Sequence, residues 1–85
     1  MNIDNKFYEI GYTKVVEHKF SEPENGEITE LILYRDEIKG LDIQFWNDKT
    51  ISKSYSYSYD NACFTIKEIN LVLEKCKDLG WYKNG

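Results

Sequence analysis

The chain has 85 residues, a net charge of −4, and contents of 41% hydrophobic and 15% aromatic residues. That length allows one small domain, and enough of it is hydrophobic to form a packed core, which excludes a disordered chain. No apolar run approaches the ~20 residues of a membrane-spanning helix, and the start lacks the basic and apolar regions of a signal peptide, so the sequence predicts a cytoplasmic protein.

Four segments carry the aromatic and β-branched residues that are typical of strands. We expect strands at residues 8–20, 27–35, 41–46 and 51–59, within a single domain that spans residues 1–85. Pro23 and Asn25-Gly26 mark the first loop, and short turns separate the later segments. Because strands joined by short turns lie side by side, the sequence predicts an antiparallel four-stranded β-meander.

The C-terminal segment predicts a helix over residues 65–79. Thr65 and Glu68 form a T-x-x-E capping box at its start, Gly80 ends it as a left-handed residue, and Trp81 is placed to fold back on Cys76. The apolar stripe expected to face the sheet consists of Ile66, Ile69, Val72, Leu73, Cys76 and Leu79. The expected fold class is therefore α+β, with one C-terminal α-helix packed on one face of the sheet.

The register of the last hairpin decides where the tyrosines of SYSYSYD, residues 54–60, lie. An even number of turn residues pairs Trp46 with Ile51, and the preceding hairpin favours Arg35 opposite Asp42. The helix then covers Ile32, Tyr34, Leu41, Ile43 and Phe45, with the serines beneath it. The opposite, partner-binding face is predicted to be aromatic and consists of Leu31, Leu33, Trp46, Ile51, Tyr55, Tyr57 and Tyr59. An odd turn, residues 47–49, would instead put Tyr55 opposite Leu41, put Lys53 beside Ile43, and make the tyrosines part of the core.

Acidic residues are concentrated in the middle of the chain. Residues 22–48 carry eight acids against Arg35 and Lys39, a net charge of −6, whereas residues 49–85 carry +2. This disfavours direct nucleic-acid binding and suits a protein partner with a basic surface, unless the acids only keep a small domain soluble. The predicted acidic partner-binding segment consists of Glu22, Glu24, Glu27, Glu30, Asp36, Glu37, Asp42 and Asp48.

The sequence contains no pattern typical of a catalytic, metal or nucleotide site. His18 is the only histidine, Cys63 and Cys76 lack the spacing of a zinc site, and none of the glycines forms a phosphate-binding loop. We therefore expect no enzyme activity, no metal and no cofactor, and we expect both cysteines to be reduced.

The acidic run through EPENGE, RDE and LD, followed by strands and then FTIKEINLVLEKCKDLGW, resembles the small phage-encoded anti-CRISPR inhibitors. The resemblance rests on size, acidity and composition and carries over no functional residue. It implies a non-enzymatic protein-binding module that blocks a nuclease in the host cytoplasm, by steric occlusion or acidic nucleic-acid mimicry. The alternatives are a homodimeric structural or accessory protein whose aromatic face is its own interface, and a single-stranded nucleic-acid binder.

Overall fold

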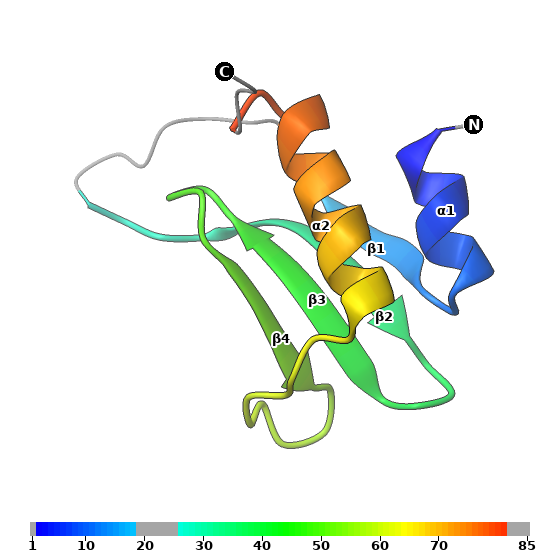
Figure 1. The fold of residues 1–85 in the computed structure, drawn as a ribbon. Helices are drawn as coiled ribbons and strands as arrows, with labels where there is room; N and C mark the ends of the chain where they lie inside the picture. The colour runs from blue at the N-terminus through cyan, green and yellow to red at the C-terminus, as the bar shows by residue number, and fades with distance from the viewer. Residues whose placement is uncertain (1, 19–25, 82–85) are drawn as a thin grey trace.

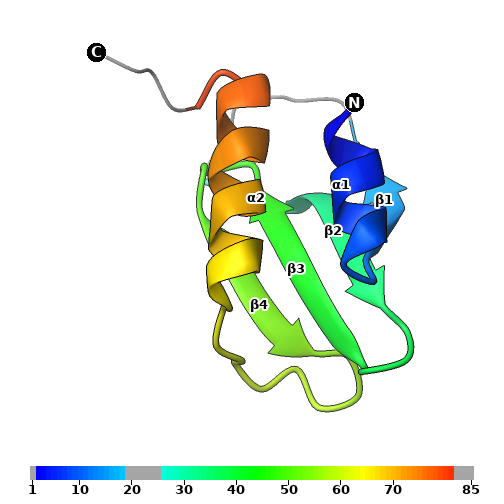
Figure 2. The same ribbon diagram turned by 45° about the vertical axis from the view of Figure 1, so that its right-hand side comes forward.

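A computed structural model describes residues 2–18 and 26–81. In chain order, its elements are α1 (Ile3–Glu9), β1 (Thr13–Glu17), β2 (Glu30–Asp36), β3 (Leu41–Trp46), β4 (Ile51–Tyr55) and α2 (Ile66–Asp78). The strands form one sheet in the order β1-β2-β3-β4 with antiparallel pairs, so the predicted meander is confirmed. Both helices cover the same face of this sheet (Figures 1 and 2).

The N-terminal segment differs from the expected strand over residues 8–20. Asn2 caps α1 by accepting a hydrogen bond from the backbone N–H of Asn5, and β1 is limited to Thr13–Glu17, with residues 19 and 20 outside the described part. The ring of Phe7 stacks on that of Tyr34 with centroids 4.1 Å apart, and both residues are fully buried. Because a seven-residue helix is marginal by itself, this packing stabilises it. The prediction of a single helix is therefore wrong.

The last hairpin adopts the odd register. The paired residues are Phe45 with Ile51, Ile43 with Lys53, and Leu41 with Tyr55. Lys49 has a positive φ of 68°, the left-handed residue that closes a three-residue hairpin loop. The even register is wrong, whereas the pairing of Arg35 with Asp42 across the previous hairpin is confirmed. The strand itself ends at Tyr55 rather than at residue 59.

The helix α2 confirms the predicted caps but not the predicted buried stripe. The capping box of Thr65 and Glu68 is present, Gly80 has a φ of 78°, and the N–H of Trp81 donates to the carbonyl of Cys76 at 2.8 Å. Of the predicted stripe, Val72 and Cys76 are buried and Leu79 packs against the core, whereas Ile66, Ile69 and Leu73 are exposed. Glu68 and Lys75 are buried in their place.

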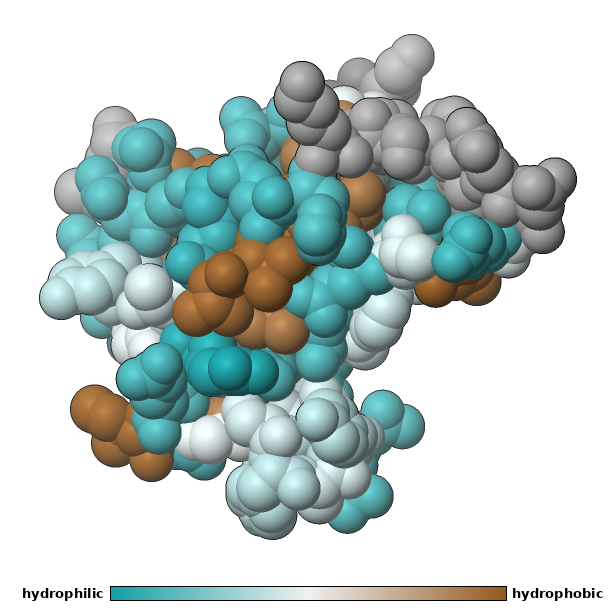
Figure 3. Space-filling view, turned by 180° about the vertical axis from the view of Figure 1, so that it is seen from behind, coloured by the Kyte–Doolittle hydropathy of each residue, from teal (hydrophilic) through white to brown (hydrophobic). Residues whose placement is uncertain are grey.

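Ser52 and Ser54 of β4 face away from the helices, which corrects the prediction that the serines lie beneath α2. The indole N–H of Trp46 donates to the hydroxyl of Ser52 at 2.8 Å, and the amide of Gln44 donates to Ser54 at 2.9 Å. Seen from behind, the molecule is largely hydrophilic, with an apolar area near the centre of the view and others at its lower left and right (Figure 3). The sheet therefore has one apolar face, which the helices cover, and one polar face.

Candidate interaction surface

The residues of the predicted aromatic face do not lie on one face. Leu31 and Ile51 belong to the core under the helices, because a bulge between Glu30 and Ile32 and the odd register turn them to that side. Leu33 and Trp46 lie on or beside the polar face, and Tyr55 stands opposite Leu41 at the end of the sheet. Tyr57 and Tyr59 lie beyond the last residue of β4. The prediction of a continuous aromatic sheet face is therefore wrong. Binding of a partner by the tyrosines stays a prediction.

The tyrosines instead gather at one end of the molecule with an isoleucine that the sequence analysis did not single out. We call Ile38, Tyr55, Tyr57 and Tyr59 the tyrosine tip. Ile38 is 99% exposed, Tyr57 79% and Tyr59 80%, and the rings of Tyr55 and Tyr57 lie 5.7 Å apart. The sequence gives a signal for the exposure of Ile38, because it lies between charged residues in the short DEIKG turn, away from any apolar stretch that could bury it.

Two loops carry the tyrosine tip and lie side by side at the lower end of Figure 1. The N–H of Ser56 donates to the carbonyl of Gly40 at 2.9 Å and joins the β4–α2 loop to the β2–β3 turn. A Cβ on Gly40, whose φ is 67°, would lie 3.7 Å from the ring of Tyr57, so this ring packs beside the turn. The tip is therefore one surface built from two segments.

Backbone hydrogen bonds fix both loops. The N–H of Tyr59 donates to the carbonyl of Tyr55, and the N–H of Tyr55 donates to the carbonyl of Asp60, each at 2.9 Å. In the neighbouring turn, the carboxylate of Asp36 accepts the N–H groups of Ile38 and Lys39 at 3.1 and 3.0 Å. Tyr59 also has a φ of 62°, a left-handed conformation that is strained for an aromatic residue and is typical of functional loops.

The described residues of the acidic segment do not form a continuous acidic surface. Glu22 and Glu24 lie outside the described residues; Glu27, Glu37 and Asp48 are exposed; Glu30 is half-buried; Asp36 and Asp42 are buried. Arg35 donates to both carboxylate oxygens of Asp42, at 2.8 and 3.0 Å. Burial acts to raise the pKa of Asp42, but the hydrogen bonds from Arg35 and Ser56 outweigh it and hold the pKa below its usual value. Asp42 is thus part of the fold rather than a free surface charge.

A buried polar cluster lies under the N-terminus of α2. Lys53 donates to Glu68 at 2.8 Å and to the carbonyl of Cys63 at 2.7 Å, and the hydroxyl of Tyr12 donates to Glu68 at 2.6 Å. Burial acts to raise the pKa of Glu68, but the bonds from Lys53, Tyr12 and the N–H of Thr65 outweigh it, so this pKa is lowered. The cluster explains how Lys53 occupies a core position beside Ile43, and its burial makes it a structural element.

No described group of histidine, cysteine, aspartate and glutamate residues is arranged to hold a metal ion. His18 and Cys63 are exposed and Cys76 is buried, and neither thiol forms a disulfide. Within residues 2–18 and 26–81, the helices are too short and too polar to cross a bilayer.

A second apolar surface runs along α2. Ile66, Ile69 and Leu73 are spaced by three and four residues, so they lie on neighbouring turns of one helix side. Ile66 is 74% exposed, and the other two are also exposed. These three side chains were predicted to pack on the sheet. The buried ion pair of Lys53 and Glu68 occupies the space between α2 and the sheet instead, and the three apolar side chains face solvent.

Comparison with known proteins gives no assignment of family or function. No protein-family model, curated protein or solved structure matches this chain. Its function must therefore be argued from its own surfaces.

Proposed function

We propose that the protein is a non-enzymatic protein-binding module that docks on a basic partner surface through the tyrosine tip. The observation that carries this proposal is the exposure of Tyr57 and Tyr59 on a loop whose backbone is fixed at its base. Tyrosines bury a large area with few rotatable bonds, and serines between them supply adaptable hydrogen bonds, which is the chemistry of antibody binding loops.

The charges around the tip support a basic partner. Glu37 is the first residue of the β2–β3 turn and Asp60 ends the tyrosine loop, and both are exposed. Lys39, in the same turn, lies toward Ile10 and Lys67 between the helices. Arginine side chains of a partner can stack on tyrosine rings while they pair with these carboxylates. In the inhibitor form of the proposal, the tip occludes the basic channel of a nuclease and the two carboxylates take the positions of phosphates.

Affinity capture with paired variants tests the proposal. We would compare the wild-type protein with Tyr57→Ser/Tyr59→Ser, and use Tyr8→Ser as the matched control, because Tyr8 is 71% exposed on α1. We expect a partner whose binding weakens roughly tenfold or more in the tip variant and is unchanged in the control. Equal capture by the tip variant and the control would refute docking through the tip.

The acidic part of the proposal is tested separately with the captured partner. Glu37→Lys/Asp60→Lys should lower the association rate and flatten its dependence on salt, because steering by opposite charge is screened by ions. Glu27→Lys/Asp48→Lys, which changes the net charge by the same amount at two exposed acids outside the tip, is the matched control. Association rates that fall equally in both variants would show only an effect of net charge.

A homodimer is the second candidate, and the exposed line on α2 favours it. Antiparallel packing of two copies of α2 would cover Ile66, Ile69 and Leu73. Light scattering at low and high salt should then give a dimer for the wild-type chain and a monomer for Ile69→Lys/Leu73→Lys. A wild-type monomer at high protein concentration would exclude this candidate.

A further inference from the structure

A groove separates the two helices on the covered side of the sheet. One part has a volume of about 330 Å³ and is lined by Lys6, Glu9, Ile10, Lys67, Asn70 and Leu71. A neighbouring part of about 490 Å³ shares three of these residues and extends to Lys39 in the β2–β3 turn. The two parts therefore form one groove between the helices, and an ion pair from Lys6 on α1 to Glu74 on α2 joins the helices beside it.

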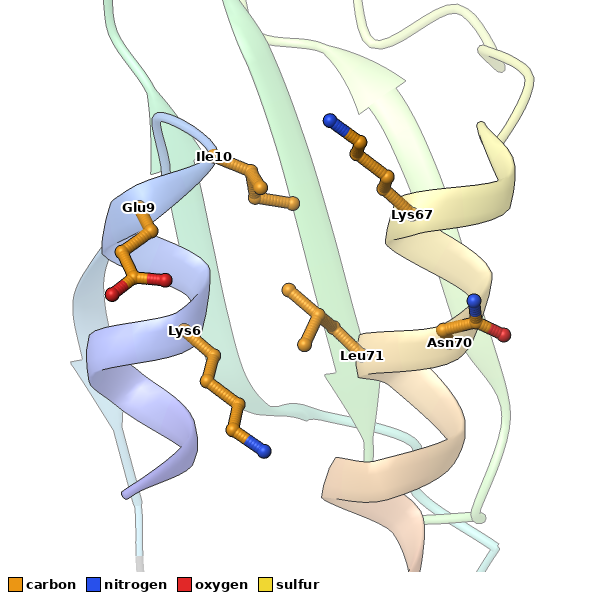
Figure 4. A pocket seen from close by; sticks show the side chains of 6 residues that line it. All are labelled: Lys6, Glu9, Ile10, Lys67, Asn70 and Leu71. Atoms are coloured by element: carbon orange, nitrogen blue, oxygen red, sulfur yellow. The ribbon is translucent and has the colours of Figure 1, made fainter. Parts of the chain in front are cut away.

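Apolar side chains lie in the middle of the groove, and a lysine lies beside them. Figure 4 shows Ile10 and Leu71 facing one another between the helices, with Lys67 extending over the gap beside them. The carboxylate of Glu9 lies over α1 rather than over the gap. The groove thus offers an apolar floor next to a positive charge.

Two lysines of the groove lack an acidic partner among the described residues, in a protein that is acidic as a whole. Lys6, Lys14, Lys53 and Lys75 each form an ion pair with a carboxylate. The side chains of Lys39 and Lys67 form no ion pair or hydrogen bond with the described residues, yet both line the same part of the groove. Two uncompensated ammonium groups beside an apolar floor are complementary to an anionic group attached to an apolar one.

We propose that this groove binds an acidic peptide segment of another protein. One apolar side chain of the segment sits between Ile10 and Leu71, and carboxylates on either side of it pair with Lys39 and Lys67. A peptide fits better than a free small molecule, because small-molecule sites enclose most of the ligand surface and this groove is open and extended. The groove contains none of the tip residues, although Lys39 follows Ile38 of the tip in the same turn, and it prefers an acidic ligand where the tip prefers a basic one.

Nuclear magnetic resonance titration of the ¹⁵N-labelled protein tests the proposal. The probe is an acetylated peptide, Gly-Leu-Glu-Asp-Leu-Gly, and its control has lysine in place of both acids. We expect saturable shifts of the Ile10, Lys67 and Leu71 amides with the acidic peptide alone. No saturable shift up to about 5 mM peptide, or equal shifts with both peptides, would overturn the proposal.

Paired variants localise the charge requirement. Lys39→Gln/Lys67→Gln should weaken acidic-peptide binding about fivefold. Lys49→Gln removes a lysine of the β3–β4 turn that forms no ion pair with the described residues, and it should leave peptide binding unchanged. Equal loss in both variants would overturn the groove as the site. Tyr57→Ser/Tyr59→Ser should leave peptide binding intact, so failure of the tip and failure of the groove are distinguishable. Binding of octanoate without binding of the peptide would replace the peptide with a small amphiphile and overturn the proposal.

Discussion

Replacing Lys53 with methionine should destabilise the protein strongly, although methionine is the more apolar residue. The side chains of Lys53 and Glu68 are only 5% and 7% exposed, so the substitution leaves a carboxylate buried without its cation. Removing one partner of a buried pair costs about 3–5 kcal/mol. Glu68 keeps the bonds from Tyr12 and from the N–H of Thr65, at 2.6 and 2.8 Å, which places the expected cost near the lower end, about 3 kcal/mol.

Thermal unfolding followed by circular dichroism measures this loss. A cost of about 3 kcal/mol in a domain of this size lowers the melting temperature by roughly 12–24 °C. Lys53→Met/Glu68→Gln, which removes the buried charge but keeps an acceptor for Tyr12, should recover about 2 kcal/mol of that loss. Lys67→Met is the matched control on an unpaired lysine and should change the melting temperature little. A small effect of Lys53→Met, or additive losses in the double variant, would refute the reasoning.

Three further predictions follow from single groups. Glu30→Gln should stabilise the protein against urea at pH 7 but not at pH 3. Burial raises the pKa of Glu30, and its Oε1 is buried without a hydrogen-bond partner among the described residues. Ionisation of Glu30 therefore opposes folding at pH 7, where the carboxyl group is charged. Tyr59→Gly should raise the free energy of unfolding by about 0.5 kcal/mol, because glycine relieves a φ of 62° and little packing is lost; a lower value would argue against strain. Stability should also fall as the pH drops below about 4. The pKa values of Asp42 and Glu68 are lower in the folded protein than in the unfolded chain, so their ionised forms stabilise the fold at any pH above the unfolded-state pKa. That stabilisation is lost as the pH falls through their folded-state pKa values. Arg35→Gln should reduce the Asp42 part of that pH dependence, and an unchanged acid transition would contradict the role of the pair.

Local chemistry made part of the fold predictable. The capping box of Thr65 and Glu68 and the left-handed Gly80 each act within a few residues, so both ends of α2 could be located from the sequence. The strand order followed in the same way from short turns. The helix α1 was missed because its aromatic residues suggest a strand, and its only local signals are the Asn2 cap and the spacing of Ile3, Phe7 and Ile10.

The candidate site depended on information that the sequence does not carry locally. The hairpin register follows from the conformation of one turn residue, Lys49, and a change of one residue in the turn moves every side chain of β4 to the other face. A lysine beside Ile43 looked unfavourable, because its partner Glu68 lies 15 residues further along the chain. The odd register was the alternative in which tyrosines enter the core, but β4 ends at Tyr55 and leaves Tyr57 and Tyr59 in solvent.

The β2–β3 turn connects the two proposed binding surfaces, since it carries Ile38 of the tip and Lys39 of the groove. Its position is fixed by Asp36, which is buried and accepts hydrogen bonds from both of these residues. Asp36 in turn lies against Gly11, where an added Cβ would come within 2.7 Å of the Asp36 carboxylate, and Gly11 has a φ of 104°. Gly11 comes directly after Ile10, the C-cap of α1 that lines the groove, so this close contact sets the position of the groove relative to the turn that carries Ile38. Both surfaces are therefore held by buried contacts before any partner binds, which lowers the ordering cost of binding at either one.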